Sequence, residues 1–131
     1  MSGLTPYLCV ADSRAAIRWY VDVLGAEVTY DPIVMPDGRV GHCELTVGGA
    51  RWMMSDEFAS VGVAAPDPDR GACVSLHLTV DDVDAVSARV VTAGTTLDRG
   101  PEDSPHAGRV AVFHDPFGHR WFLNQPFDGA S

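Results

Sequence analysis

The chain of 131 residues contains no lysine, because all nine of its basic residues are arginines. Mechanisms that need a lysine Schiff base or the lysine of a phosphate-binding P-loop are therefore excluded. Basic charge is scarce as a whole, since 18 Asp and Glu residues against nine arginines give a formal net charge of −9. Such a chain repels phosphate groups, and we expect it to bind neither nucleic acid nor a membrane surface.

Cysteines and long apolar runs are also few. The three cysteines, Cys9, Cys43 and Cys73, lie far apart and form no C-x-x-C pair, so we expect reduced, mostly buried thiols rather than a zinc or redox site. No apolar run approaches the ~20 residues that a membrane-spanning helix needs, and the first residues lead directly into a strand-like pattern. These absences predict a soluble, cytoplasmic protein.

The chain does contain an internal repeat at a spacing of 70 residues, as from Leu8 to Leu78. The same spacing relates further matching residues: Val10, Asp12 and Ala15 to Val80, Asp82 and Ala85, and Gly38-Arg39-Val40 and Gly48 to Gly108-Arg109-Val110 and Gly118. A repeat of this kind indicates two copies of one structural module. Because duplicated modules commonly form a shared cleft, the side chains that line such a cleft are the candidate functional residues.

The first copy, residues 1–61, predicts a strand, a helix and three further strands. Residues 4–10 are typical of a strand, and Asp12 is placed to cap a helix that runs to Leu24 and ends at Gly25. The further strands are predicted over residues 27–34, 39–47 and 51–55. The module is therefore of the βαβββ type.

The second copy, residues 73–131, repeats this order after a linker, residues 62–72, that is rich in Pro, Asp and Gly. Its predicted elements are a strand over 74–80, a helix from Asp82 to Ala93 that ends at Gly94, and strands near 95–97, 109–114 and 120–124. The polar segment from Asp98 to Gly108 is predicted to be a loop that could act as a lid. Together the two modules are expected to form one domain.

Three motifs stand in order along the two copies: V-A-D-S-x-x-A-I-x-W-Y-x-x-x-L-G at 10–25, V-D-D-V-D-A at 80–85 and D-P-F-G-H-R-W at 115–121. In these motifs the chain resembles the vicinal oxygen chelate superfamily, which includes glyoxalase I, bleomycin-resistance proteins and extradiol dioxygenases. The resemblance implies an α+β fold of two tandem βαβββ modules, which form a half-open eight-stranded cleft with one helix per module on the outside. It also implies a homodimer, because relatives of this size usually assemble as twofold dimers.

Metal-using members of this superfamily place one ligand on the first strand and one on the last strand of each module, usually His, Gln or Glu. The corresponding positions here are Thr5 and Ser75 on the first strands, and Phe122 and Trp52 on the last strands, or Met53 or Met54 if the alignment shifts. None of these side chains suits the divalent ions that such sites hold. We therefore expect no metal ion and no other cofactor.

Side chains of a strand alternate between its two faces, so residues two apart from these positions also point into the expected cleft. The expected lining is aromatic with a few polar groups: Thr5, Tyr7, Cys9, Trp52, Met54, Ser75, His77, Phe122 and Asn124. A mostly apolar concavity with a few placed polar groups is typical of a small-molecule site. We therefore predict that the chain binds a small aromatic or amphipathic molecule, for sequestration or resistance.

Catalysis is the alternative function. His77 shares a strand face with Ser75 and could act as a general base, with Ser75 or with Tyr7, in a metal-free enzyme. His42 and Glu44 could instead form a nonstandard metal site with His77, for lyase, isomerase or dioxygenase chemistry. A third alternative is an interaction module, in which the aromatic side chains fill the cleft and the outer surface binds a partner.

Overall fold

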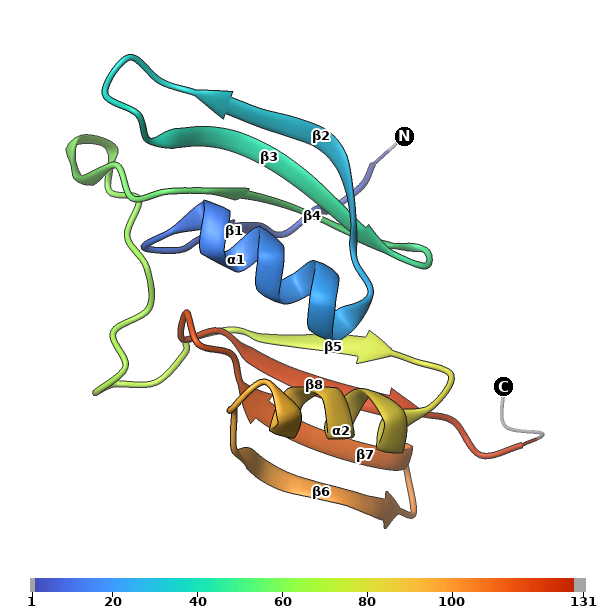
Figure 1. Cartoon of the computed structure of the whole chain (residues 1–131). Coiled ribbons are helices and arrows are strands. Elements are labelled where there is room, and N and C mark those ends of the chain that lie inside the picture. The colour runs from blue at the N-terminus through green and yellow to red at the C-terminus, as the bar shows by residue number, and fades with distance from the viewer. Residues whose placement is uncertain (1, 129–131) are drawn as a thin grey trace. The chain divides into compact units, whose positions relative to one another are not determined.

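The computed structural model describes residues 2–128, and the chain forms two compact units, Met1–Pro66 and Asp67–Ser131. Each unit holds one four-stranded sheet with a helix packed against it (Figure 1). This confirms the predicted α+β architecture of two tandem βαβββ modules. The boundary between the units falls inside the segment 62–72, and the cleft expected between the modules stays a prediction. No helix within residues 2–128 is long and apolar enough to cross a membrane.

The first unit begins with β1 (Tyr7–Cys9) and α1 (Ser13–Trp19), which continues as a π-helical turn, η1 (Tyr20–Leu24). Strands β2 (Glu27–Val34), β3 (Val40–Val47) and β4 (Ala50–Ser55) and a short 3-10 turn, η2 (Ala59–Val61), complete it. The sheet order is β1-β4-β3-β2, with β1 parallel to β4. The predicted helix ends are confirmed, because Asp12 accepts a hydrogen bond from Ala15 N at 3.1 Å and Gly25 ends the helix with a φ of 72°.

The second unit repeats this order with β5 (Ser75–Thr79), α2 (Val83–Thr92), β6 (Leu97–Ser104), β7 (Gly108–His114) and β8 (Arg120–Gln125). Its sheet order, β5-β8-β7-β6, matches that of the first unit. Asp82 caps α2 through Ala85 N at 3.0 Å, as Asp12 caps α1. The prediction of a loop and lid from Asp98 to Gly108 is wrong, because most of this segment is β6, which pairs with β7.

Strand β6 lacks a clear sequence signal because it lies at the end of its sheet. Only one side of the strand is paired, so it accommodates Pro101 and register shifts on both sides of Arg99. Strand β2 holds the same place in the first sheet, and it also contains a proline, Pro32, and shifts in register. Both end strands are therefore irregular, and the polar side chains of β6 give no alternating pattern.

Each helix covers one face of its sheet and buries the apolar core there. In the first unit Tyr20 meets Trp52 edge to face, with ring centroids 5.5 Å apart, and Leu45 is fully buried. In the second unit α2 packs against β6, β7 and β8, and its Val83 and Val90 are fully buried. The opposite face of each sheet, which the helix does not cover, is called the uncovered face below.

Two buried carboxylates hold the ends of the strands. Asp56, directly after β4, accepts from Ser13 N and from Val40 N, each at 2.7 Å, and so joins the start of α1 to the start of β3. Asp115 accepts from the backbone N–H of Phe117 and His119 and from the indole N–H of Trp121. The D-P-F-G-H-R-W motif therefore builds the turn between β7 and β8.

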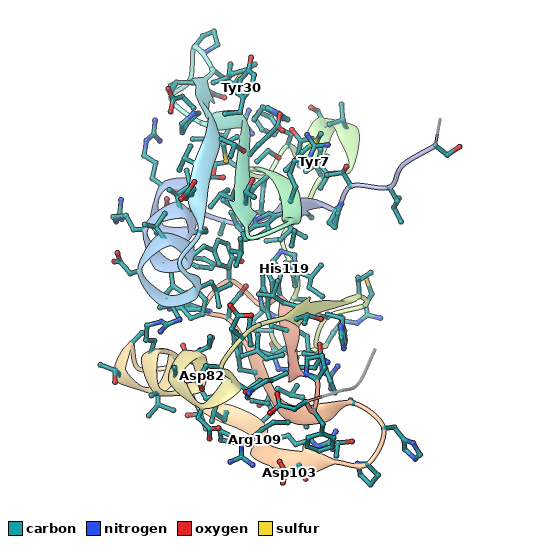
Figure 2. All side chains as sticks on the ribbon, turned by 90° about the vertical axis from the view of Figure 1, so that its right-hand side faces the viewer. Tyr7, Tyr30, Asp82, Asp103, Arg109 and His119 are labelled. Atoms are coloured by element: carbon teal, nitrogen blue, oxygen red, sulfur yellow. The ribbon has the colours of Figure 1, made fainter. Side chains whose placement is uncertain are left out.

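A guanidinium also joins three elements of the second unit. Arg109, on β7, donates to both carboxylate oxygens of Asp84 on α2, at 2.7 and 3.0 Å. It also donates to Asp103 on β6 at 3.1 Å, and Figure 2 labels these two residues. The Arg109 bonds hold the pKa of Asp84 below its usual value. Arg109 belongs to the repeated Gly-Arg-Val sequence, so this part of the repeat serves the fold.

Candidate functional site

Strand register decides which side chains share the uncovered face of the first sheet. Tyr7 pairs with Met53, and Met53 pairs with Glu44, so these three side chains point the same way. Met54, the next residue, is fully buried on the helix side. The uncovered face of this sheet therefore carries Tyr7, Met53 and Glu44.

The sequence also predicts Trp52 and Met54 on this face, and that prediction is wrong. Trp52 pairs with the buried Leu45 and contacts Tyr20 of the helical segment, and Met54 pairs with the buried Leu8. Both side chains belong to the core. The physical reason is the period of two along a strand, since an alignment error of one residue moves a side chain to the opposite face.

A continuous hydrogen-bonded chain of side chains crosses the uncovered face of the first sheet. The Tyr7 hydroxyl lies 2.6 Å from His42 Nδ1, and His42 Nε2 lies 3.0 Å from Glu44 Oε2. Arg51 donates to Glu44 Oε1 and to Thr5 Oγ1, each at 3.1 Å. The Glu44 carboxylate is thus shared by an imidazole and a guanidinium, and Arg51 neutralises its charge.

Two half-exposed tyrosines flank His42 in this chain. The ring centroids of Tyr7 and Tyr30 each lie 5.4 Å from the imidazole, and the two residues are 51% and 50% exposed (Figure 2). Burial raises the pKa of Tyr7 above its usual value, and the negative charges of Cys43 and Glu44 add to the shift. Tyr7 therefore stays protonated at neutral pH, and its hydroxyl lies within hydrogen-bond distance of His42 Nδ1 and of the Gly41 carbonyl, at 2.6 and 3.2 Å.

The uncovered face of the second sheet brings together the side chains that the sequence predicts there. Ser75 pairs with Arg120, and His77 pairs with Phe122, while the intervening Trp121 is buried. The His77 and Phe122 rings stack, with centroids 5.2 Å apart and an angle of 15° between their planes. Arg120 donates to Ser75 Oγ at 2.7 Å. This face therefore combines stacked rings with a cation.

Two of the predicted lining residues are engaged within the protein. Asn124 is 8% exposed, accepts from Thr79 Oγ1 at 2.7 Å and donates to the Ala107 carbonyl at 3.0 Å. Cys9 is buried at the β1 pairing with Ser55, and burial, together with the charges of Glu57 and Asp56, raises the pKa of its thiol to about 11. Their contact with a ligand stays a prediction.

The residues at the expected metal-ligand positions do not fit a divalent ion. Thr5 and Ser75 each accept a hydrogen bond from an arginine, Arg51 and Arg120, whose positive charge repels a cation. On the last strands, Phe122 and Met53 offer no nitrogen or oxygen, and the indole N–H of Trp52 is not a metal ligand. A site in which guanidinium groups occupy these positions suits an anion better than a metal ion.

The nonstandard site suggested for His42, Glu44 and His77 also finds no support. His42 and Glu44 bond to each other, whereas His77 belongs to the second unit and stacks on Phe122. Within residues 2–128 no three His, Cys, Asp or Glu side chains are grouped so that they could hold a metal ion.

Sequence reasoning missed three residues of the uncovered faces, Tyr30, Arg51 and Arg120, and gave Met53 only as the alternative to Trp52. Strand register shows that the pair Tyr7 and Met53 in the first sheet is equivalent to the pair His77 and Phe122 in the second sheet. The chain between the two members of the pair is one residue shorter in the second copy. The repeated dipeptide Arg-Trp, at 51–52 and 120–121, is the sequence signal that reveals this shift.

Comparison with known sequences gives a family and relatives. The model of the family described as "Glyoxalase/Bleomycin resistance protein/Dioxygenase superfamily" matches residues 4–123. An uncharacterized protein of Mycobacterium bovis is 38% identical over 127 residues, which cover 95% of this chain and 83% of that protein. An uncharacterized protein of Mycobacterium tuberculosis H37Rv is also 38% identical, with 95% and 74% covered.

Solved structures share the fold. TnmS3, an antibiotic binding protein from Streptomyces sp. CB03234, is 28% identical, with a TM-score of 0.68 over 96% of this chain and 97% of its own. A glyoxalase/bleomycin resistance protein from the same Streptomyces is 28% identical, with a TM-score of 0.66 over 95% and 100%. TioX from Micromonospora sp. ML1 is 25% identical, with a TM-score of 0.73 over 95% and 98%.

Proposed function

Since the chain belongs to the glyoxalase/bleomycin resistance protein/dioxygenase superfamily, we propose that it binds a small aromatic or amphipathic molecule on the uncovered faces of its sheets, without a metal ion. Sequestration of a harmful compound, or resistance to it, is the role that fits such binding. A structural relative of 28% identity is an antibiotic binding protein, which supports this class of ligand. The observation that carries the proposal is the pair of half-exposed tyrosines beside the His42–Glu44–Arg51 chain.

The first sheet has the chemistry that a flat ligand needs. Tyr7 and Tyr30 expose ring surface on both sides of His42, and a stacked aromatic pair contributes roughly 0.5–1.5 kcal/mol beyond the area that it buries. The Arg51 guanidinium has five N–H groups, of which Glu44 and Thr5 each accept one, so it keeps hydrogen-bond donors for carbonyl or phenol oxygens of the ligand. Aromatic surface then supplies affinity, and the donors fix orientation.

Titration with a panel of aromatic antibiotics, followed by calorimetry and by melting temperature, tests the proposal. A ligand at about 100 times its Kd adds about 2.7 kcal/mol to the stability of the folded state. Because Tyr30→Ala removes one ring, we expect it to weaken binding by roughly two- to tenfold. Val91→Ala on α2 is the matched control, since Val91 is 54% exposed but lies on a helix. A panel that produces neither heat nor stabilisation would refute the proposal.

Metal-free catalysis is the second candidate, and the Tyr7–His42–Glu44 chain favours it. Glu44 orients the His42 imidazole, and His42 in turn contacts a phenol that stays protonated, so a proton can pass between the phenol and the imidazole. Mass spectrometry of the same titration mixtures distinguishes the two functions. Conversion of a bound compound that disappears in His42→Gln, while binding persists, would establish catalysis over simple binding.

Assembly as a twofold homodimer and a cytoplasmic location stay predictions. A dimer would place a second copy of each uncovered face in the particle. Light scattering of the purified chain measures its mass directly.

A further inference from the structure

The two units carry the same arginine–hydroxyl pair at equivalent places. In the first unit Arg51 donates to Thr5, and in the second Arg120 donates to Ser75. The match follows from strand register. Met53 pairs with Tyr7 and Phe122 pairs with His77, and each arginine lies two residues before Met53 or Phe122 on the same strand. The duplication has therefore kept a guanidinium on each uncovered face.

The units differ in what neutralises this guanidinium. In the first sheet Glu44 pairs with Met53 and holds Arg51 at 3.1 Å. In the second sheet the residue that pairs with Phe122 is Val112, so a shorter and uncharged side chain stands at the sequence position that corresponds to Glu44. The second unit thus keeps the cation and lacks its internal counter-charge.

Other carboxylates do not replace it. Within the described part of the second unit, residues 67–128, no carboxylate lies within ion-pair distance of Arg120. Two acidic residues of β6 have their own partners, since Asp98 bonds to His114 at 2.6 Å and Glu102 to Arg99 at 3.1 Å. Arg120 is partly buried, so its charge is less screened by water than that of a fully exposed arginine.

Aromatic surface lies beside this arginine. Phe122, two residues further along β8, stacks on His77 with ring centroids 5.2 Å apart. The Arg99 guanidinium lies 6.0 Å from the centre of the Phe122 ring. A ligand that satisfies this face therefore needs a negative group for Arg120 and a flat apolar group for Phe122.

We propose that Arg120 and Ser75 bind the carboxylate of an aromatic anion, whose ring packs against Phe122 and His77. The ligand carboxylate plays the part in the second unit that the Glu44 carboxylate plays in the first. The Arg51–Glu44 ion pair is therefore the internal counterpart of the ion pair between Arg120 and the ligand. This assignment rests on the proposed function and narrows its ligand class to aromatic acids. The net charge of −9 repels anions at long range, so selectivity comes from this local cation.

Calorimetry with a matched pair of probes, 2-naphthoate and 2-naphthamide, tests the assignment on the full chain. The two compounds share one ring system and differ in charge. We expect 2-naphthoate to bind about tenfold more tightly or better, and added salt to reduce this preference. Arg120→Gln should remove the preference while 2-naphthamide binding persists. Arg70→Gln is the charge-matched control, because Arg70 lies in an exposed turn and belongs to no strand.

A reciprocal variant transfers the site to the first unit. Glu44→Val removes the carboxylate that neutralises Arg51, so that Arg51 keeps only its hydrogen bond to Thr5, as Arg120 has only its bond to Ser75. We expect the number of 2-naphthoate molecules bound per chain to rise from one to two. Equal binding of the two probes, or a preference that survives Arg120→Gln, would overturn the assignment and leave the proposed function standing. If neither probe binds, the assignment also fails, and the antibiotic panel judges the proposed function separately.

Discussion

Replacing Asp56 tests how the first unit holds its helix against its sheet. The carboxylate is 8% exposed, and each of its oxygens accepts one backbone hydrogen bond at 2.7 Å, from Ser13 N and from Val40 N, whose residues are fully buried. A hydrogen bond to a charged group contributes roughly 1.5–3 kcal/mol, so Asp56→Ala should cost about 3–5 kcal/mol. A unit of this size has a total stability of only about 3–10 kcal/mol. We therefore expect the first unit to be partly unfolded in this variant.

The matched position in the second unit is Gln125, whose side-chain oxygen accepts a single bond from Val83 N at 2.9 Å. Because this bond is neutral, Gln125→Ala should cost only about 1–2 kcal/mol. Asp56→Asn keeps one acceptor and should fall between the two. Urea unfolding followed by circular dichroism gives the free energies. Trp19 and Trp52 report on the first unit by fluorescence, and Trp121 reports on the second. Equal losses for Asp56→Ala and Gln125→Ala would refute the reasoning.

Three further predictions concern the thiols and the glycines. Iodoacetamide should label the exposed Cys73 at pH 8 and spare the buried Cys43, whose pKa burial raises from 9.0 to about 11. Because the folded state holds this proton more tightly than the unfolded chain, its contribution to stability is full below pH 9 and is lost as the pH rises towards 11, which melting curves would show. Gly38→Ala should cost about 1–2 kcal/mol through its φ of 89° alone, whereas Gly108→Ala should cost about 2–5 kcal/mol because its Cβ would also collide with the Gln125 carbonyl. Equal urea midpoints for the two alanine variants would contradict that difference.

The sequence predicts the fold well where local chemistry is strong. Asp12 and Asp82 cap their helices, because each carboxylate accepts a hydrogen bond from the backbone N–H three residues later in the chain. Gly25 has the positive φ that residues with a Cβ avoid. These signals act over a few residues and do not depend on the rest of the chain. The order of strands and helices therefore follows from them and from the repeat.

Other features depend on partners distant in sequence, and the sequence alone predicts them poorly. The face of Trp52 is set by its pairing with Leu45 and not by its own neighbours, so an alignment error of one residue placed it on the wrong side. Strand β6 forms by pairing with β7, which is the strand that has the apolar residues typical of a strand. The polar residues of β6, such as Asp98 and Glu102, do not predict a strand by themselves. The missing counter-charge of Arg120 becomes visible only when Val112 is seen opposite Phe122.

The irregular end strands affect how this chain can associate with itself. A regular free strand is a template on which another chain can extend the sheet, and apolar side chains such as Ile33 and Val34, which are 44% and 54% exposed, would strengthen that contact. Pro32 and Pro101 each remove a donor from such a template, and the shifts in register bend it. We therefore expect the sheets to resist fibril-like growth, and a homodimer, if it forms, to be built from side-chain contacts.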